Sequence, residues 1–216
     1  MMPPDPQFAN VMIYILPGMG ADHRMYPPPW PSLVDSTFID WPAYAGELTL
    51  AEVAQAIVAK HALARGAWLV GSSLGGMVAC EIARLISVRG LILVGSATTR
   101  DEVSSWFSRL SPFFELAPIN LVRQLAGIVP AEIAQMFKDS DPAFVRAMCR
   151  AIIRWEGLRN ATIKIHRIHG RRDRVILFPS GVDLALDGGH LIAMTHAAEC
   201  VAYIRTIVEA NGFPVR

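Results

Sequence analysis

Short apolar runs alternate with longer amphipathic segments along most of this chain. The runs that we predict as strands are residues 11–16, 37–41, 67–70, 91–94, 163–168 and 182–186. Apolar and small residues at helical spacing predict helices over residues 49–63, 77–86 and 195–210. The first run is continuously apolar, which is typical of a strand that is covered on both faces of a sheet. Alternation of strands and helices through short links predicts an α/β fold with a mainly parallel sheet and right-handed crossovers.

Residues 98–160 interrupt this alternation. Helical segments punctuated by prolines fill the stretch, and it shows no strand pattern. Its aromatic residues are Trp106, Phe107, Phe113, Phe114, Phe137, Phe144 and Trp155. They either wall an apolar pocket or pack the segment onto the rest of the protein, and packing is the commoner role for any single aromatic residue. We therefore expect a core made of residues 1–97 and 161–216, with a helical insertion at 98–160 over the sheet edge.

The composition is that of a single soluble domain with a sizeable core. Of 216 residues, 52% are hydrophobic and 18% are charged, and the formal net charge is +1. This balance lacks the basic excess of proteins that bind nucleic acids or membrane surfaces. Three widely spaced cysteines, Cys80, Cys149 and Cys200, suit buried thiols in a reducing compartment. Residues 1–10 lack the pattern of a signal peptide and no apolar run is long enough to insert across a membrane, so we expect a cytoplasmic protein.

Residues 67–79 carry the clearest chemical signal in the chain. They predict a strand, a tight turn and a helix, with Ser73 between Gly71 and Gly75 in a Gly-x-Ser-x-Gly pattern. In a nucleophile elbow the serine has a strained backbone and the strand and helix nearly collide, so tiny residues are needed on either side. The turn presents the Ser73 hydroxyl at the carboxyl edge of the sheet. It also directs the Leu74 backbone N–H, at a helix N-terminus, toward an oxyanion beside Ser73.

A serine hydroxyl needs a base near neutral pH, and that base needs an orienting acid. Asp173 follows one predicted strand, and His190 lies in a glycine-rich loop after the next. Because the carboxyl ends of parallel strands share one edge of the sheet, we expect both side chains to meet Ser73 there, in the chain order serine, acid, histidine. We prefer Asp173 as the acid to Asp101, which follows an earlier strand. We also prefer it to Asp187, which is too close in sequence to reach behind the histidine ring.

The remaining histidines have positions that favour other roles. His61 and His196 lie in or beside predicted helices and are expected to face solvent, whereas His166 lies within a strand. His169 ends that strand and is expected to support the loop that follows it. His23 follows the first glycine-containing loop and is a candidate for lining the pocket.

The loop after the first strand supplies a second expected oxyanion donor. There Met19 lies between Gly18 and Gly20, whose lack of side chains lets the backbone approach a ligand closely. Two N–H donors, from Met19 and Leu74, would face one developing charge. Each would contribute on the order of 3 kcal/mol to the lowering of the reaction barrier.

Taken together, these segments resemble the α/β-hydrolase superfamily over nearly the whole chain. The segments that carry the resemblance are residues 16–20 (Leu-Pro-Gly-Met-Gly), 71–76 (Gly-Ser-Ser-Leu-Gly-Gly), 169–173 (His-Gly-Arg-Arg-Asp) and 188–190 (Gly-Gly-His). The resemblance implies Ser73 as nucleophile, His190 as base and Asp173 as acid, with Met19 and Leu74 as oxyanion donors. It also implies that the helical insertion forms a cap, that the substrate is a small ester or thioester, and that no metal or organic cofactor takes part.

Three features depart from the usual pattern of this superfamily. Pro17-Gly18 stands where many members have His-Gly, which changes the support behind the oxyanion donor but leaves the backbone N–H. Many members begin with two more strands, and the residues before Val11 are too few for them, so we expect a six-stranded core. Residues 40–44 (Asp-Trp-Pro-Ala-Tyr) replace a glycine-rich turn after the second strand, which predicts aromatic rings near the pocket.

Two other functions fit parts of the sequence. A dinucleotide-binding oxidoreductase would explain Gly18-Met19-Gly20 after the first strand and Asp40 at the end of the second. However, His23 stands where the third glycine would be, and the proline-rich stretch around it disfavours the helix that would receive a pyrophosphate. A non-catalytic protein on the hydrolase fold would bind a small apolar ligand, but it would have no need of a complete triad.

Overall fold

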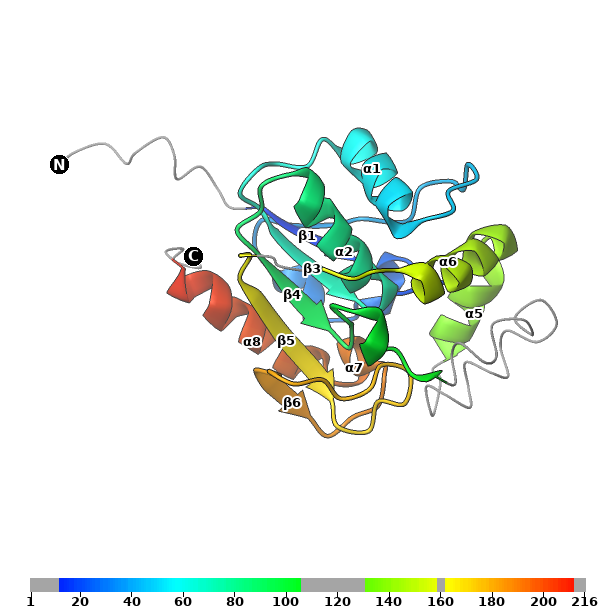
Figure 1. The fold of residues 1–216 in the computed structure, drawn as a ribbon. Helices are drawn as coiled ribbons and strands as arrows, with labels where there is room; N and C mark the ends of the chain where they lie inside the picture. Colours follow the sequence, from blue (N-terminus) through cyan, green and yellow to red (C-terminus); the bar gives the residue numbers. More distant parts are fainter. Residues whose placement is uncertain (1–11, 106–130, 159–161, 212–216) are drawn as a thin grey trace.

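Six strands form one parallel sheet in the order β2-β1-β3-β4-β5-β6. The strands are β1 Ile13–Leu16, β2 Ser36–Phe38, β3 Trp68–Ser72, β4 Gly90–Val94, β5 Ile165–Gly170 and β6 Leu184–Leu186. The computed structural model describes residues 12–105, 131–158 and 162–211, and Figure 1 shows how their elements are arranged. The six-stranded parallel sheet confirms the α/β fold expected from the alternating pattern.

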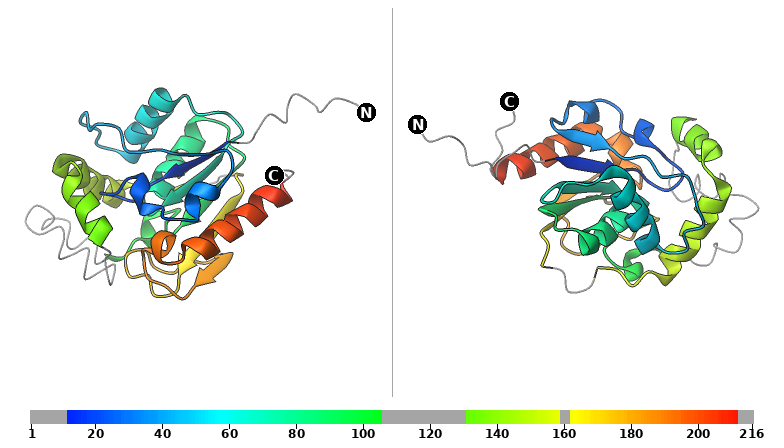
Figure 2. Two further views of the ribbon diagram at one scale, coloured as in Figure 1. Left: turned by 180° about the vertical axis from the view of Figure 1, so that it is seen from behind. Right: turned by 90° about the horizontal axis from the view of Figure 1, so that it is seen from above.

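Helices cover both faces of this sheet. The α-helices are α1 Leu50–His61, α2 Leu74–Leu85, α5 Ala131–Asp139, α6 Pro142–Arg154, α7 Ile192–Thr195 and α8 Ala197–Ala210, and the 3-10 turns are η2 His23–Met25, η3 Trp30–Ser32 and η4 Arg100–Glu102. The view from above in Figure 2 separates α1 and α2 on one face from α8 on the other. α1 begins with the capping box predicted at Thr49, whose hydroxyl accepts from the Glu52 N–H while the Glu52 carboxylate accepts from the Thr49 N–H.

The inner strands β1, β3, β4 and β5 divide their apolar side chains between two cores. Leu69 of β3 and Leu91 of β4 belong to the core under α1, α2 and α6, whereas Val70 and Ile92 belong to the core under α8. Successive side chains of a strand point to opposite faces, so a continuously apolar run fills both cores at once. This is why the runs do not alternate between polar and apolar residues. Among the described residues, no helix is both long and apolar enough to pass through a lipid bilayer.

The order of the strands places a crevice between β1 and β3. The chain leaves β1 toward β2 on one edge of the sheet and leaves β3 toward β4 in the opposite direction. In open α/β sheets, connections that diverge in this way leave room for a ligand beyond the carboxyl ends of the two strands. The loop that starts at Pro17 and the turn at Ser73 follow these two strands, so both expected oxyanion donors lie beside the crevice.

Every strand differs from its predicted range at one or both ends, and β2, β5 and β6 show the physical reasons and consequences. β2 ends at Phe38 rather than at residue 41, because β1, with which it pairs, ends at Leu16 and leaves only the Ile39 N–H to bond the Ile15 carbonyl (2.8 Å). β5 is displaced two residues along the chain from the predicted 163–168, and β6 is shorter than the predicted 182–186. His169, expected in a loop, therefore lies inside β5, where it is aligned with Ala185 of β6.

The described part of residues 98–160 is helical. It contains η4, α5 and α6, and Figure 1 shows the last two as a pair beside the carboxyl end of the sheet. Four of the aromatic residues expected to line a pocket or to pack this segment, at positions 106, 107, 113 and 114, lie outside the described residues. Of the others, Phe144 packs its ring on Trp41 with centroids 5.4 Å apart, and Trp155 is buried with its indole N–H on Glu81 (2.7 Å). One aromatic thus borders the loops at the sheet edge, while the other packs the segment onto α2.

Candidate active site

Ser73 occupies a sharp turn between β3 and α2 in a backbone conformation that L-residues rarely adopt. Its φ is 51° and its ψ is −119°, well outside the helical and extended regions. A Cβ added at Gly71 would collide with the backbone of Gly75 and Gly76, and one added at Gly75 would collide with the carbonyls of Leu16 and Pro17. The glycines are therefore required by close approach of the helix to β3 and to the end of β1. This strained turn leaves the Ser73 side chain partly exposed.

The structure brings the three predicted side chains together in one hydrogen-bonded chain. The Ser73 Oγ lies 2.9 Å from Nε2 of His190, and Nδ1 of the same ring lies 2.8 Å from Oδ2 of Asp173. His190 is 9% exposed and Asp173 is 7% exposed, so the ring and the carboxylate are largely shielded from water. A neutral imidazole in this arrangement has Nδ1–H donating to the carboxylate and Nε2 ready to accept the serine proton.

Both oxygens of the Asp173 carboxylate take part in hydrogen bonds. Oδ1 accepts the backbone N–H groups of Val175 (2.8 Å) and Ile176 (3.0 Å), which leaves Oδ2 directed at His190. Burial acts to raise the pKa of Asp173, but the charge and hydrogen bond of His190, the Ile176 N–H and the nearby His169 outweigh it, so the pKa is lowered. The carboxylate is therefore ionised near neutral pH, as an orienting acid must be.

His169 is a buried neighbour of this carboxylate. It is 1% exposed, and its Nε2 lies 3.4 Å from Asp173 Oδ2 and 3.2 Å from the Ile176 carbonyl oxygen. Burial is the main cause that lowers the pKa of His169, which keeps the ring neutral near neutral pH. A neutral ring can hold the Asp173 loop by donating from Nε2 without placing a second positive charge beside His190. The expected support of this loop by His169 thus has a contact that provides it, from inside the strand.

The Met19 loop lies directly against the nucleophile. A Cβ built on Gly18 would stand 3.7 Å from the Cβ of Ser73, which is ordinary van der Waals contact. Leu74 is the first residue of α2, so its N–H precedes the hydrogen-bonded part of the helix. Within the described parts of the chain, neither the Met19 N–H nor the Leu74 N–H has an acceptor. The part of the chain that the structure describes therefore leaves two backbone donors without acceptors, one in the loop that contacts Ser73 after β1 and one directly after Ser73.

Sequence reasoning missed a second serine that steadies the elbow. The Ser96 hydroxyl, just beyond β4, donates to the Ser73 carbonyl oxygen (2.6 Å), and the Ser73 N–H donates to the Val94 carbonyl (3.1 Å). The strained residue is thus tied to the end of β4 through both of its backbone polar groups. The signal for Ser96 is its position two residues after a parallel strand, which by itself does not distinguish it from other loop serines.

The competing candidates lie elsewhere. Asp101 is exposed in η4, and Asp187 is exposed and pairs with Arg172 (3.3 Å). His61 and His196, which were expected to face solvent, are both of intermediate exposure, so they face it only in part. His23 is exposed and is not among the residues that line the cavity at the sheet edge, although its partner Asp40 is.

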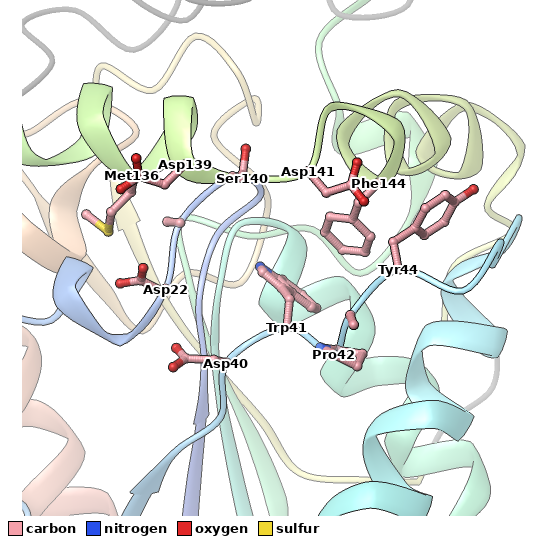
Figure 3. A pocket seen from close by; sticks show the side chains of 13 residues that line it. Asp22, Asp40, Trp41, Pro42, Tyr44, Met136, Asp139, Ser140, Asp141 and Phe144 are labelled. Carbon is pink, nitrogen blue, oxygen red and sulfur yellow. The ribbon is translucent and has the colours of Figure 1, made fainter.

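A cavity of about 510 Å³ lies beside the Met19 loop. It is lined by Gly20, Ala21, Asp22, Asp40, Trp41, Pro42, Ala43, Tyr44, Met136, Asp139, Ser140, Asp141 and Phe144. In Figure 3 the residues of α5, α6 and the turn between them stand opposite the loops that follow β1 and β2. None of the three triad residues lines it, and the lining residue next to Met19 in the chain is Gly20. Its walls include the aromatic rings that residues 40–44 predicted.

One group of three potential metal ligands occurs in the described residues. Ligand atoms of Asp22, His23 and Asp40 lie within 4.8 Å of one another. However, Asp40 accepts from the His23 backbone N–H (2.7 Å) and contacts the His23 ring (2.8 Å), while Asp22 pairs with Arg24 (2.7 Å). These contacts account for the cluster as a link between two loops without a metal ion. Asp40, which the dinucleotide alternative would assign to a ribose, is therefore already occupied by His23.

Comparisons with known proteins match this chain to α/β hydrolases. A family model described as the Alpha/beta hydrolase family matches residues 13–203. No curated protein matches the sequence. A thermophilic esterase from Thermogutta terrifontis is structurally similar with a TM-score of 0.69 and 18% identity over 93% of this chain and 90% of that one.

Two lactonases are also structurally similar to this chain. The N-acyl homoserine lactonase AidH, complexed with N-butanoyl homoserine, has a TM-score of 0.72 and 17% identity over 96% of this chain and 92% of that one. The enol-lactonase from Burkholderia xenovorans LB400 has a TM-score of 0.70 and 17% identity over 93% of this chain and 91% of that one. At these identities the likeness shows a shared fold.

Proposed function

We propose that this chain, which belongs to the alpha/beta hydrolase family, is a serine hydrolase acting on a small carboxylic ester or thioester. The observation that carries the proposal is the hydrogen-bonded chain from Ser73 through His190 to Asp173. Each link has the length that proton transfer and orientation require, about 2.6–3.2 Å. The roles proposed for these residues are nucleophile, general base and orienting acid, in that order.

In the proposed acylation step, Ser73 Oγ forms a bond to the substrate carbonyl carbon while its proton passes to His190 Nε2. The negative charge that develops on the carbonyl oxygen is received by the N–H groups of Met19 and Leu74. His190 then gives the proton to the departing alcohol or thiol as the bond to it breaks, which leaves Ser73 acylated. Asp173 keeps the Nδ1–H tautomer throughout and stabilises the positive ring.

Deacylation repeats these transfers with water as the nucleophile. His190 takes a proton from a water molecule whose oxygen attacks the acyl carbon. The tetrahedral species collapses with return of the proton from His190 to Ser73 Oγ, and the carboxylic acid is released. Every proton in this cycle moves through Nε2 of one ring, so the buried Asp173 carboxylate is needed in both halves.

The surroundings of the site favour a small substrate with apolar parts. Met19 and Trp41 lie at the loop side, and we propose that the helical segment at 98–160 acts as the cap over them. The esterase and lactonases that share the fold are named for open and cyclic carboxylic esters, which are the same class of bond. We therefore propose that lactones belong beside esters and thioesters in the first substrate screen.

Labelling with a fluorophosphonate probe tests the proposed nucleophile. Wild-type protein should take up one probe per chain at Ser73 and should hydrolyse short-chain p-nitrophenyl esters or thioesters. Ser73→Ala should lose both properties while retaining the thermal unfolding midpoint within a few degrees. The control is Ser72→Ala, which changes the adjacent serine, buried in β3 at 3% exposure, and should keep both label and turnover.

The same experiment separates this function from ligand binding without chemistry. A folded wild-type protein that neither reacts with the probe nor turns over any ester, thioester or lactone contradicts the proposal. Such a protein would instead fit the non-catalytic binder of a small apolar ligand. A Ser73→Ala variant with wild-type turnover would show that the activity arises at another residue.

A further inference from the structure

The Gly18 carbonyl oxygen, in the loop beside Ser73, accepts a hydrogen bond from the indole of Trp41, which follows β2. Trp41 Nε1 donates to the Gly18 carbonyl oxygen over 3.0 Å. That oxygen belongs to the peptide bond that links Gly18 to Met19, and the N–H of the same planar unit is the proposed oxyanion donor. The bond is trans, so its C=O and N–H point in opposite directions. An anchor on the oxygen therefore fixes the direction in which the Met19 N–H points.

The local turn explains why the Met19 N–H has no acceptor among the described residues. The Gly18 carbonyl also accepts the Ala21 N–H (3.2 Å), and Gly20 has a φ of +69°, as expected at the third position of a type II turn. The residue in the second position of such a turn has an N–H that the turn itself does not use. Two glycines in this loop give the free chain many alternative conformations, so contacts from outside the turn have to select this one.

Two consecutive residues at the end of β2 supply those outside contacts. Trp41 binds the turn at Gly18, and Asp40 binds it further along, where its carboxylate accepts the His23 N–H (2.7 Å) and contacts Nδ1 of the His23 ring (2.8 Å). The Met19 N–H lies between these two points of attachment. Trp41 is itself partly buried and packed against Phe144 of α6, which limits the freedom of its indole ring.

We propose that Trp41 is a positioning residue for the oxyanion hole, acting through the Gly18–Met19 peptide. This inference rests on the proposed function, since it assigns Met19 as a donor to the oxyanion. The indole N–H holds the peptide plane and also polarises it, because a hydrogen bond to the oxygen of an amide makes its N–H a stronger donor. Trp41 touches neither the nucleophile nor the base. The proposed effect of its indole N–H falls on the charged tetrahedral species, and it is separate from the place of the Trp41 ring in the wall of the cavity.

The test replaces Trp41 with 3-benzothienylalanine, in which sulfur stands where the indole N–H was while shape and ring packing are kept. Trp41→Phe is the simpler second variant. Rates are expressed per active site, titrated with the fluorophosphonate probe, so that misfolded protein does not contribute. Loss of a whole oxyanion donor costs about 100-fold to 1000-fold in kcat. Because Met19 keeps its N–H here, we expect kcat to fall about tenfold with KM within about twofold.

A second readout addresses the oxyanion directly. A trifluoromethyl ketone forms a reversible adduct with the serine whose oxygen carries the negative charge of the tetrahedral species. Its inhibition constant should weaken about tenfold, in proportion to kcat/KM, in both variants at position 41. The matched control is Trp155→Phe, which removes another indole hydrogen bond, from the residue that follows α6 to Glu81 of α2 (2.7 Å). It should lower the unfolding midpoint but keep kcat per titrated site within about twofold.

Each outcome bears on one of the two proposals. If wild-type protein labels and turns over substrate while the benzothienyl variant keeps kcat and the ketone affinity within about twofold, the positioning role is wrong and the proposed hydrolase stands. A rise in KM with unchanged kcat would also overturn it, since Trp41 would then act only as a pocket wall. Wild-type protein that lacks both labelling and turnover would overturn the function and the inference together.

Discussion

The change Asp173→Asn tests the triad most sharply, because the structure predicts which way the amide must face. In the wild type, Oδ1 accepts two backbone N–H groups, from Val175 and Ile176, and Oδ2 accepts from His190 Nδ1. An asparagine has one oxygen and one NH₂ group in these places. If the NH₂ faced the two backbone donors, two buried hydrogen bonds would be lost to donor–donor contacts. The amide oxygen therefore stays at the backbone and the NH₂ faces His190.

That orientation puts His190 in the wrong tautomer. Facing a donor, Nδ1 must become an acceptor, so the ring proton moves to Nε2, the nitrogen that lies 2.9 Å from Ser73 Oγ. A protonated Nε2 on a neutral ring cannot take the serine proton. The corresponding change in a serine protease with a Ser-His-Asp triad lowers kcat by about 10⁴-fold. At 1.36 kcal/mol per factor of ten this is about 5 kcal/mol of lost transition-state stabilisation, and we expect a loss of the same order here.

The assay compares kcat/KM for the best ester found in the screen, with matched amide variants at two aspartates. Asp187→Asn makes the same chemical change at the alternative acid, whose side chain is 79% exposed, and should keep kcat/KM within about twofold. Asp173→Asn should retain the wild-type KM and the fold, as judged by circular dichroism. Retention of more than about a tenth of the wild-type kcat would refute the tautomer argument. A loss in Asp187→Asn with Asp173→Asn left active would show that the acid had been assigned to the wrong residue.

Three further predictions follow from the charges and buried groups of the same structure. Burial lowers the pKa of His169 below its usual 6.5, so the unfolded chain binds more protons than the folded chain as the pH falls below that value; the free energy of unfolding should therefore decrease, and urea titrations from about pH 7.5 to about pH 5.5 should show a smaller decrease in His169→Gln. Burial raises the pKa of Cys149 and of Cys200 to about 12, so iodoacetamide should alkylate these thiols only after denaturation, as mass spectrometry of intact protein will show; rapid labelling of native protein would contradict their burial. The cavity beside the Met19 loop is lined by four aspartates and, among the described residues, by no basic side chain. In a set of matched esters that carry an anionic, a neutral or a cationic terminal group, the anionic ester should therefore have the highest KM. Equal KM values would exclude this cavity as part of the substrate site.

The triad could be predicted because each of its residues is tied to a strand end. A parallel sheet brings all its carboxyl ends to one edge, so Ser73 after β3, Asp173 after β5 and His190 after β6 need no further information to be placed near one another. The elbow was readable for a related reason. Its glycines are required by backbone collisions, which depend on the local path of the chain and leave a trace in the sequence itself.

Contacts that depend on the relative placement of two loops leave no such trace. The Ser96 hydroxyl on the Ser73 carbonyl and the His169 ring on Asp173 are both short, well-placed interactions. Serine and histidine are common residues in many environments, and their positions in the sequence do not encode a partner far along the chain. The displacement of β5 by two residues adds to this, since it moved His169 from an expected loop into the strand.

The same stretch that misled the strand prediction builds the support of the Met19 loop. Residues 37–41 have the composition of a strand, but β2 lies at the edge of the sheet and pairs with β1, which ends at Leu16. Beyond Ile39 the backbone has no strand to pair with, so Asp40 and Trp41 are released from the sheet and their side chains bind the adjacent loop instead. Extending β2 by pairing would therefore remove both anchors of the turn. The early end of this edge strand is what allows two ordinary strand residues to orient a peptide beside the nucleophile.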